Sequence, residues 1–112
     1  MDFNDYQRAA LRTANTSAER ARSDRLANWA LGLTGEAGEI AEKMKKHLYH
    51  DHPLDHDALV KELGDVLWYL AVLSHEVGVE LDEVAVTNIA KLRLRYPDGF
   101  SPEHSLRRVD VR

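Results

Sequence analysis

The sequence predicts an all-α domain, and three observations support this. Proline is confined to Pro53, Pro97 and Pro102, which leaves two long stretches free of the strongest helix breaker. In both stretches apolar residues recur at steps of three and four residues, as on one face of a helix. No run alternates apolar and polar residues for long enough to propose a strand. We therefore expect residues 1–112 to form one domain with four main helices, arranged like a four-helix bundle.

The first helix is expected from about residue 3 to about residue 15, with Asp2 or Asn4 as its N-cap. Its apolar side consists of Tyr6, Ala10, Leu11 and Ala14. The end of this helix is ambiguous, because the residues 15–18 are compatible with fraying or with a helix that continues to Arg22.

A second, longer helix is expected from Ser23 or Asp24 to about Tyr49. Its apolar residues form a continuous stripe of roughly 33 Å at 1.5 Å per residue. The stripe consists of Leu26, Ala30, Leu33, Ala37, Ile40, Met44 and Leu48. Such a stripe must pack against other helices.

The third helix is expected over about residues 56–77, after a polar connection, with Asp55 or Asp57 as its cap. Residues 66–73 are apolar nearly all round, and one neighbouring helix could not cover them. The third helix is therefore predicted to be central or to form a subunit contact. Gly78 is a suitable left-handed stop.

The fourth helix is expected from about Leu81 to Arg95, because Pro97 ends it. The last segment, about residues 97–112, contains a further proline, a glycine and three arginines. We expect this segment to be an irregular tail.

Composition and charge exclude several classes of function. The chain has no cysteine, so disulfides, thiolate zinc sites and cysteine nucleophiles are excluded, and carboxylates and histidines must carry any chemistry. A net charge of −4 provides no broad positive field for nucleic acid. No apolar run approaches the roughly 18 residues of a membrane span, and the acidic start differs from a secretory signal, so a cytoplasmic location is expected. A compact fold of this mass should expose roughly 6,200 Å² of surface.

Two pairs of carboxylates lie in the two long helices, each pair with a spacing of three residues. The pairs are Glu36 with Glu39, and Glu62 with Asp65. This spacing places both members of a pair on one helix face. If the two helices form an antiparallel hairpin, the four carboxylates converge. Their repulsion in a partly desolvated site would favour bound divalent cations, and ligands that are all oxygen favour Mg²⁺ or Mn²⁺.

Glutamates at helical spacing are commonly a solvated face, so either pair alone is weak support for a metal site. Three glycines strengthen the interpretation, because Gly35, Gly38 and Gly64 lie beside the acidic residues inside helices. Each costs roughly 1 kcal/mol relative to alanine in a helix interior. That cost is easier to understand where a backbone or a ligand approaches closely.

The fourth helix carries candidates for contacts to an anionic ligand. Asn88 is the polar residue in its apolar stripe, and it forms either a core hydrogen bond or a contact to substrate or to a ligating carboxylate. Lys91 and Arg95 follow on the adjacent face and are surface charges or phosphate contacts. Lys43, seven residues after Glu36, lies near the face of the first acidic pair.

Three separated segments carry a resemblance to a known family. They are Gly35-Glu36-Ala37-Gly38-Glu39, then Glu62-Leu63-Gly64-Asp65-Val66-Leu67-Trp68-Tyr69-Leu70, then Asn88-Ile89-Ala90-Lys91-Leu92 with Arg95-Tyr96-Pro97 and Gly99-Phe100. The order E-x-x-E, spacer, E-x-x-D, then an asparagine and a lysine on the next helix resembles the MazG-type nucleoside triphosphate pyrophosphohydrolases. The resemblance covers about residues 25–100.

This resemblance implies an all-α MazG-type domain that uses Mg²⁺, with Mn²⁺ as a possible substitute. The implied reaction converts a nucleoside triphosphate, often deoxy or non-canonical, to its monophosphate and pyrophosphate, which would clean the nucleotide pool. A homodimer or homotetramer is implied as well. The resemblance assigns four residues as metal ligands and catalytic groups: Glu36, Glu39, Glu62 and Asp65. It assigns Asn88, Lys91 and Arg95 to substrate binding, and Lys43 is a further candidate for contacts to the phosphates.

Alternatives remain for both the substrate and the class of protein. A related helical pyrophosphohydrolase could act on phosphoribosyl-ATP, and a non-catalytic interaction module could carry the same carboxylates as surface residues. A di-iron or di-manganese carboxylate bundle is disfavoured, because neither acidic pair forms the Glu-x-x-His motif. Which glutamate acts as a general base is not decided by the pattern.

Histidines and tryptophans offer two further hypotheses. Four histidines crowd the connection between the long helices: His47, His50, His52 and His56. They could bind a transition metal, although a loop more commonly presents histidines to solvent. Trp29, Trp68 and Tyr69 could stack on a nucleobase, although large aromatic residues at helical spacing usually lie in the core or in a subunit interface.

Overall fold

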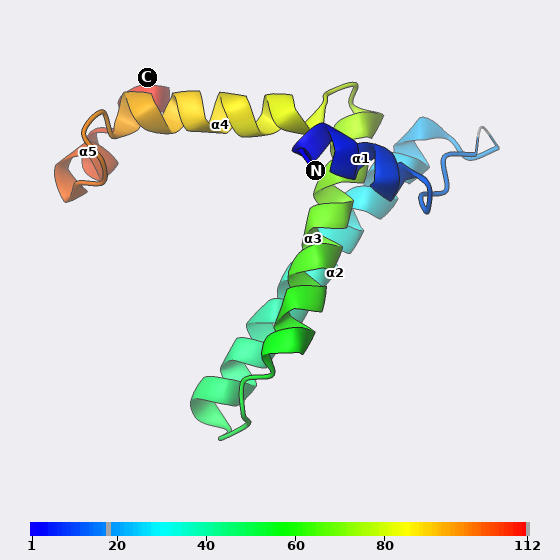
Figure 1. Cartoon of the computed structure of the whole chain (residues 1–112), viewed down its shortest axis with the longest axis horizontal. Coiled ribbons are helices and arrows are strands. Elements are labelled where there is room, and N and C mark those ends of the chain that lie inside the picture. Colours follow the sequence, from blue (N-terminus) through cyan, green and yellow to red (C-terminus); the bar gives the residue numbers. More distant parts are fainter. Residues whose placement is uncertain (18, 112) are drawn as a thin grey trace.

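The computed structural model describes residues 1–17 and 19–111, and this part of the chain is helical without a β-strand. In chain order, the helices are α1 (Phe3–Leu11), α2 (Arg22–Tyr49), α3 (His56–Glu76), α4 (Leu81–Arg95) and α5 (Pro102–Arg107), followed by a 3₁₀ turn (Val109–Val111). The all-α prediction is confirmed. Figure 1 shows α2 and α3 as a long hairpin, with α1 across the end of the hairpin from which α4 projects.

The end of the first helix differs from the prediction. The first helix ends at Leu11, four residues earlier than expected, and turns follow it. Asp2 is its cap and accepts a hydrogen bond from the Asp5 amide at 2.7 Å. Ala18, in the ambiguous connection, lies outside the described residues.

The expectation of an irregular tail was wrong, because α5 and the 3₁₀ turn lie within it. The Ser101 hydroxyl accepts a hydrogen bond from the His104 amide at 3.1 Å, and Pro102 occupies the first turn of α5. A serine followed by proline is a sequence signal for a helix start, because the proline needs no amide partner there. At the far end of α4, this segment folds back onto the helix (Figure 1).

Helix α1 fixes the start of α4. Glu80 precedes α4 but makes no capping bond with its side chain, so the first amides of the helix need other acceptors. Gln7 accepts from the Leu81 amide at 3.0 Å, and Asn4 accepts from the Asp82 amide at 3.0 Å. Gln7 is buried and also donates to the carbonyls of Ala71 and Val79 at 3.0 and 3.1 Å. These polar contacts set the direction in which α4 leaves the hairpin.

A small apolar core lies where α1, α3 and α4 meet. Its buried residues are Ala10, Ala71 and Leu81, with Tyr6, Leu67 and Trp68 packed against them. Because α3 contacts α1, α2 and α4, the prediction of a central third helix is confirmed.

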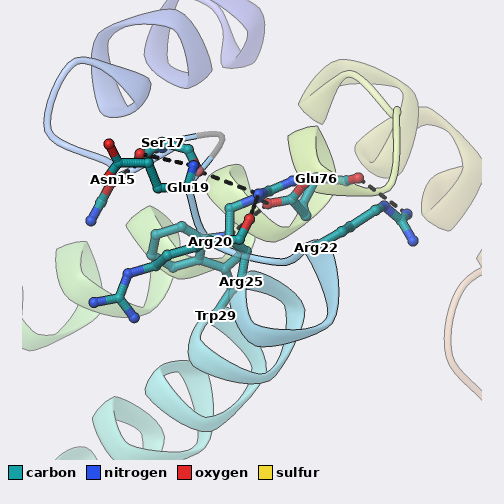
Figure 2. Close-up of polar contacts among 8 residues, drawn as sticks. All are labelled: Asn15, Ser17, Glu19, Arg20, Arg22, Arg25, Trp29 and Glu76. Carbon is teal, nitrogen blue, oxygen red and sulfur yellow. Dashed lines mark hydrogen bonds and ion pairs between the residues drawn. The ribbon is translucent and has the colours of Figure 1, made fainter.

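A half-buried ion pair joins the start of α2 to the end of α3 (Figure 2). Arg25 Nε donates to Glu76 Oε1 at 2.7 Å, and the indole nitrogen of Trp29 donates to the same oxygen at 3.2 Å. The Arg25 guanidinium also donates to the Arg20 carbonyl at 2.5 Å, which ties the preceding connection to the hairpin. The hydrogen bond from Arg25 lowers the pKa of Glu76 below its ordinary value.

The single chain is extended and exposes much apolar surface. It exposes 8,182 Å², against roughly 6,200 Å² expected for a compact protein of this mass. Its radius of gyration is 17.2 Å, against about 13 Å for a compact chain of this length. One apolar row of α3 remains exposed: Val60, Leu63 and Leu70, continued by Val77 just after the helix. The hairpin therefore lacks the covering layer that would complete a bundle.

No helix in residues 1–17 and 19–111 is both long enough and apolar enough to cross a membrane.

We expect Glu76→Gln to lower the free energy of unfolding by roughly 1–3 kcal/mol, because the half-buried Arg25 guanidinium then loses its charged acceptor. Urea denaturation followed by circular dichroism measures the change. Glu103→Gln, at a carboxylate whose side chain is 75% exposed, is the matched control and should stay within about 0.5 kcal/mol. Equal stability of the two variants would contradict a structural role for the ion pair.

Candidate metal centre

Three carboxylates converge between α2 and α3. Glu36 of α2 and Glu62 and Asp65 of α3 each offer an oxygen, and these three oxygens lie within 4.8 Å of one another. Glu36 and Glu62 are half-buried, whereas Asp65 is exposed. We refer to these three residues as the acidic trio.

The register of the hairpin places the trio. Glu36 follows Arg25 by eleven residues along α2, and Asp65 precedes Glu76 by eleven residues along α3. Because both helices rise by about 1.5 Å per residue in opposite directions, the ion pair sets Glu36 and Asp65 at the same level. The spacing of three then places Glu62 on the same face as Asp65.

The electrostatics of the trio are those of an uncompensated anionic site. The pKa of Glu36 is raised, chiefly by a hydrogen bond to Glu62, then by desolvation and by the negative charge of Asp65. One carboxylate oxygen of Glu62, Oε2, is buried and has no hydrogen-bond partner in the described structure. A buried acceptor without a partner costs roughly 1–3 kcal/mol, and a cation would satisfy it. The donor set therefore fits a hard divalent cation such as Mg²⁺ or Mn²⁺.

Glu39 lies outside the trio, one turn farther along α2. It contributes a negative charge that helps to raise the pKa of Glu36. Its side chain lines a cavity of about 240 Å³ at the loop end of the hairpin, together with Glu42, Lys43, Lys46, His52, Pro53, Leu54 and Asp55. Of the four carboxylates expected to converge, the structure therefore gathers three.

The residues expected to contact substrate lie in three different places. Lys43 lines the cavity beside Glu39. Asn88 and Lys91 line a shallow groove on α4, and no residue of the trio lines that groove. Arg95 donates two hydrogen bonds of 2.7 Å to the carboxylate of Asp110, and this pairing holds the pKa of Asp110 below its ordinary range.

The glycines of the acidic motifs face open space. A methyl group added at Gly35, Gly38 or Gly64 would meet no other atom within 4 Å. These three glycines are therefore not explained by close approach of another part of this chain. The open space beside them could accommodate a ligand or a second chain. The glycine that does permit a close approach is Gly32, which lies against the ring of Tyr69 and was missed in the sequence.

The histidines and tryptophans have structural contacts. His47 Nδ1 lies 2.9 Å from the His52 carbonyl oxygen, and within residues 1–17 and 19–111 the clustered histidines form no metal-ligand group. Trp29 is 3% exposed, which confirms the alternative that it lies in the core. The indole of Trp68 donates to the Ala10 carbonyl and to the Thr13 hydroxyl of the segment after α1, at 3.2 and 2.9 Å.

Comparison with known proteins identifies similar sequences. The family model for the MazG nucleotide pyrophosphohydrolase domain matches residues 25–100. Gene 37 protein of Mycobacterium phage L5 is 44% identical over 73 residues, which are 62% of this chain and 64% of that protein. The dCTP pyrophosphatase 1 proteins of Rattus norvegicus and Mus musculus are each 31% identical over 90 residues, which are 75% of this chain and 53% of theirs. The chain thus spans between half and two thirds of the length of these relatives. No solved structure matches.

The raised pKa of Glu36 predicts a pH dependence of stability in the cation-free protein. A carboxyl group with a higher pKa in the folded state stabilises the fold at low pH, and this contribution is lost as the pH rises through the folded-state pKa. We therefore expect the free energy of unfolding to fall as the pH rises above about 4.5, the ordinary glutamate value. Chemical denaturation in EDTA across this range measures it. Glu36→Gln should remove the decline, and an unchanged slope would contradict carboxylate repulsion as its cause.

Proposed function

The chain belongs to the MazG nucleotide pyrophosphohydrolase family, and we propose that it hydrolyses a nucleoside triphosphate to a nucleoside monophosphate and pyrophosphate with Mg²⁺ as cofactor. The observation that carries this proposal is the acidic trio with its unpartnered Glu62 oxygen. Hydrolysis of a phosphoanhydride needs neutralised phosphate oxygens and a water that loses its proton near neutral pH. Mg²⁺ held by carboxylates supplies both when bound.

Each carboxylate has a proposed task in this reaction. Glu36, Glu62 and Asp65 would hold the cation across the hairpin, so the triphosphate would bind at the level of the trio. Glu39 is the fourth carboxylate, one turn from Glu36 along α2, and it lines the cavity that Lys43 also lines. Because Glu39 lies outside the trio, it is free to act either as a further ligand or as the base that accepts a proton from the attacking water.

The substrate contacts are proposed to involve a second copy of the chain. Asn88 and Lys91 are the phosphate contacts that the family resemblance indicates, yet their groove on α4 is separate from the trio. The exposed apolar row of α3 and the projecting α4 support a homodimer or homotetramer in which helices of another copy cover the hairpin (Figure 1). Such packing would bring α4 of one copy toward the trio of another copy. Lys43 would then meet the phosphates from the loop side of the hairpin, and Arg95 would need to leave Asp110 before it could do so.

Deoxynucleotides are the first substrates to test. The names of the mammalian relatives refer to dCTP, and no feature of the trio distinguishes one base from another. A role in removing unwanted nucleotides from the pool follows from such an activity. Phosphoribosyl-ATP is the alternative substrate, and a non-catalytic module is the alternative class of protein.

The reaction is tested with a panel of ribonucleotides, deoxynucleotides and phosphoribosyl-ATP in Mg²⁺, with pyrophosphate and orthophosphate scored separately. We expect pyrophosphate and a monophosphate as products, and expect Glu36→Gln, Glu62→Gln and Asp65→Asn each to lower kcat/KM by about 100-fold or more. Glu103→Gln on α5 should retain the activity of the parent chain. Release of orthophosphate alone, or the absence of turnover with every compound, would refute the proposal.

The proposed assembly is tested by sedimentation equilibrium. We expect a mass of two or four chains of 12.7 kDa each. Leu70→Asp should shift the mass toward a single chain, because it places a charge in the apolar row of α3. Leu106→Asp on α5, at a leucine that is 81% exposed, serves as the control. A monomeric parent chain at assay concentration would contradict a shared site.

A further inference from the structure

Of the described glycines, Gly32 alone is in close contact with a side chain of another helix. At Gly32 the ring of Tyr69 lies directly on the backbone of α2, and a methyl group added there would lie 2.8 Å or less from ring atoms Cδ1, Cε1 and Cζ. Side-chain carbons essentially never approach so closely, so the ring occupies this position only because residue 32 is glycine. At the other glycines of α2 a methyl group would meet nothing within 4 Å.

The Tyr69 ring also packs against another aromatic ring of α3. Its neighbour Trp68 meets it edge to face, with ring centroids 4.9 Å apart and planes at 88°. Trp68 in turn meets Trp29 edge to face at 5.7 Å and 76°. Trp29 is buried and bonded to Glu76, so the row of aromatic rings extends from the ion pair of Figure 2 to the Tyr69 contact. The ring is therefore a rigid spacer between the helices.

This spacer stands one helical turn from the acidic trio on both helices. Gly32 precedes Glu36 by four residues, and Tyr69 follows Asp65 by four residues. Residues four apart lie on the same helix face, about 6 Å from each other. Each helix is stiff over one turn. The distance between α2 and α3 at the spacer therefore also determines the distance between the two helices at the trio.

We propose that Tyr69, seated on Gly32, is a positioning residue that sets the distance between Glu36 and the carboxylates of α3. The inference deepens the proposed function and rests on it in one respect, namely that the trio binds a divalent cation. The aromatic ring fulfils this role through its thickness, so its hydroxyl group is dispensable. The cation centre needs its oxygens placed to within a few tenths of an ångström, and a misplaced ligand lowers affinity even in a folded protein.

A role in packing alone makes a different prediction. It would lower the stability of variants at these two positions but leave the cation affinity of the folded molecules unchanged. A positioning role changes the cation affinity of molecules that remain folded, and the conservative variant that keeps the ring restores it. The two roles are therefore separated by measuring cation binding and stability on the same variants.

The test is calorimetric titration of the full chain with Mn²⁺ in the absence of nucleotide, together with the thermal unfolding temperature. We expect Gly32→Ala and Tyr69→Ala each to raise the Kd for Mn²⁺ by about 10-fold or more, and Tyr69→Phe to stay within about twofold of the parent. Gly32→Ala/Tyr69→Ala should bind no more weakly than Tyr69→Ala alone, since the glycine matters only through the ring. Tyr49→Ala, at a tyrosine that is 78% exposed on the same hairpin, is the matched control and should bind like the parent.

The outcomes separate this inference from the proposed function. If Gly32→Ala fails to fold, Tyr69→Ala and Tyr69→Phe decide the question. Folded variants that all bind Mn²⁺ like the parent overturn the positioning role, as does a parent chain that binds no Mn²⁺. A parent that binds Mn²⁺ but cleaves no nucleotide refutes only the proposed reaction.

Discussion

The antiparallel register of α2 against α3 is the constraint on which the rest of the structure depends. A helix turns by about 100° per residue, so a slip of one residue would carry Glu36 away from Glu62 and Asp65. The half-buried Arg25–Glu76 pair resists such a slip, because a displaced Arg25 would lose its charged acceptor. The Tyr69 ring on Gly32 adds a steric constraint between this pair and the trio.

The trio itself works against folding, and the elements around it compensate. The raised pKa of Glu36 and the unpartnered Glu62 oxygen indicate stored repulsion in the absence of a cation. The stabilising contacts are concentrated at the end of the hairpin away from the connecting loop, where α1 supplies Gln7 and Asn4 to the first turn of α4. A site of mutually repelling carboxylates, next to a well-bonded end of the hairpin, is the arrangement expected where the residues of the site are selected for binding and not for stability.

Much of this arrangement follows from sequence patterns, and the exceptions have physical causes. Proline positions and apolar periodicity located the four main helices, and the spacing of Glu62 and Asp65 located their shared face. The contact at Gly32 was missed, because the glycine motif near Glu36 indicated Gly35 and Gly38 instead and only tertiary packing reveals which glycine a ring touches. Asn4 was predicted as a possible cap of its own helix, but its side chain accepts a hydrogen bond from the first turn of α4, which is distant in sequence. Ser101 and Pro102 are a signal for a helix start, but the nearby glycine and arginines favoured the interpretation as an irregular tail.

The most direct test is a crystal structure of the chain with Mn²⁺ and a non-hydrolysable α,β-imido nucleoside triphosphate, with Mn²⁺ located by anomalous scattering. The account predicts a metal peak bridging α2 and α3, with oxygens of Glu36, Glu62 and Asp65 within about 2.0–2.4 Å and phosphate oxygens on its open side. A peak elsewhere, or a nucleotide bound away from the hairpin with Glu36 turned from α3, would contradict it.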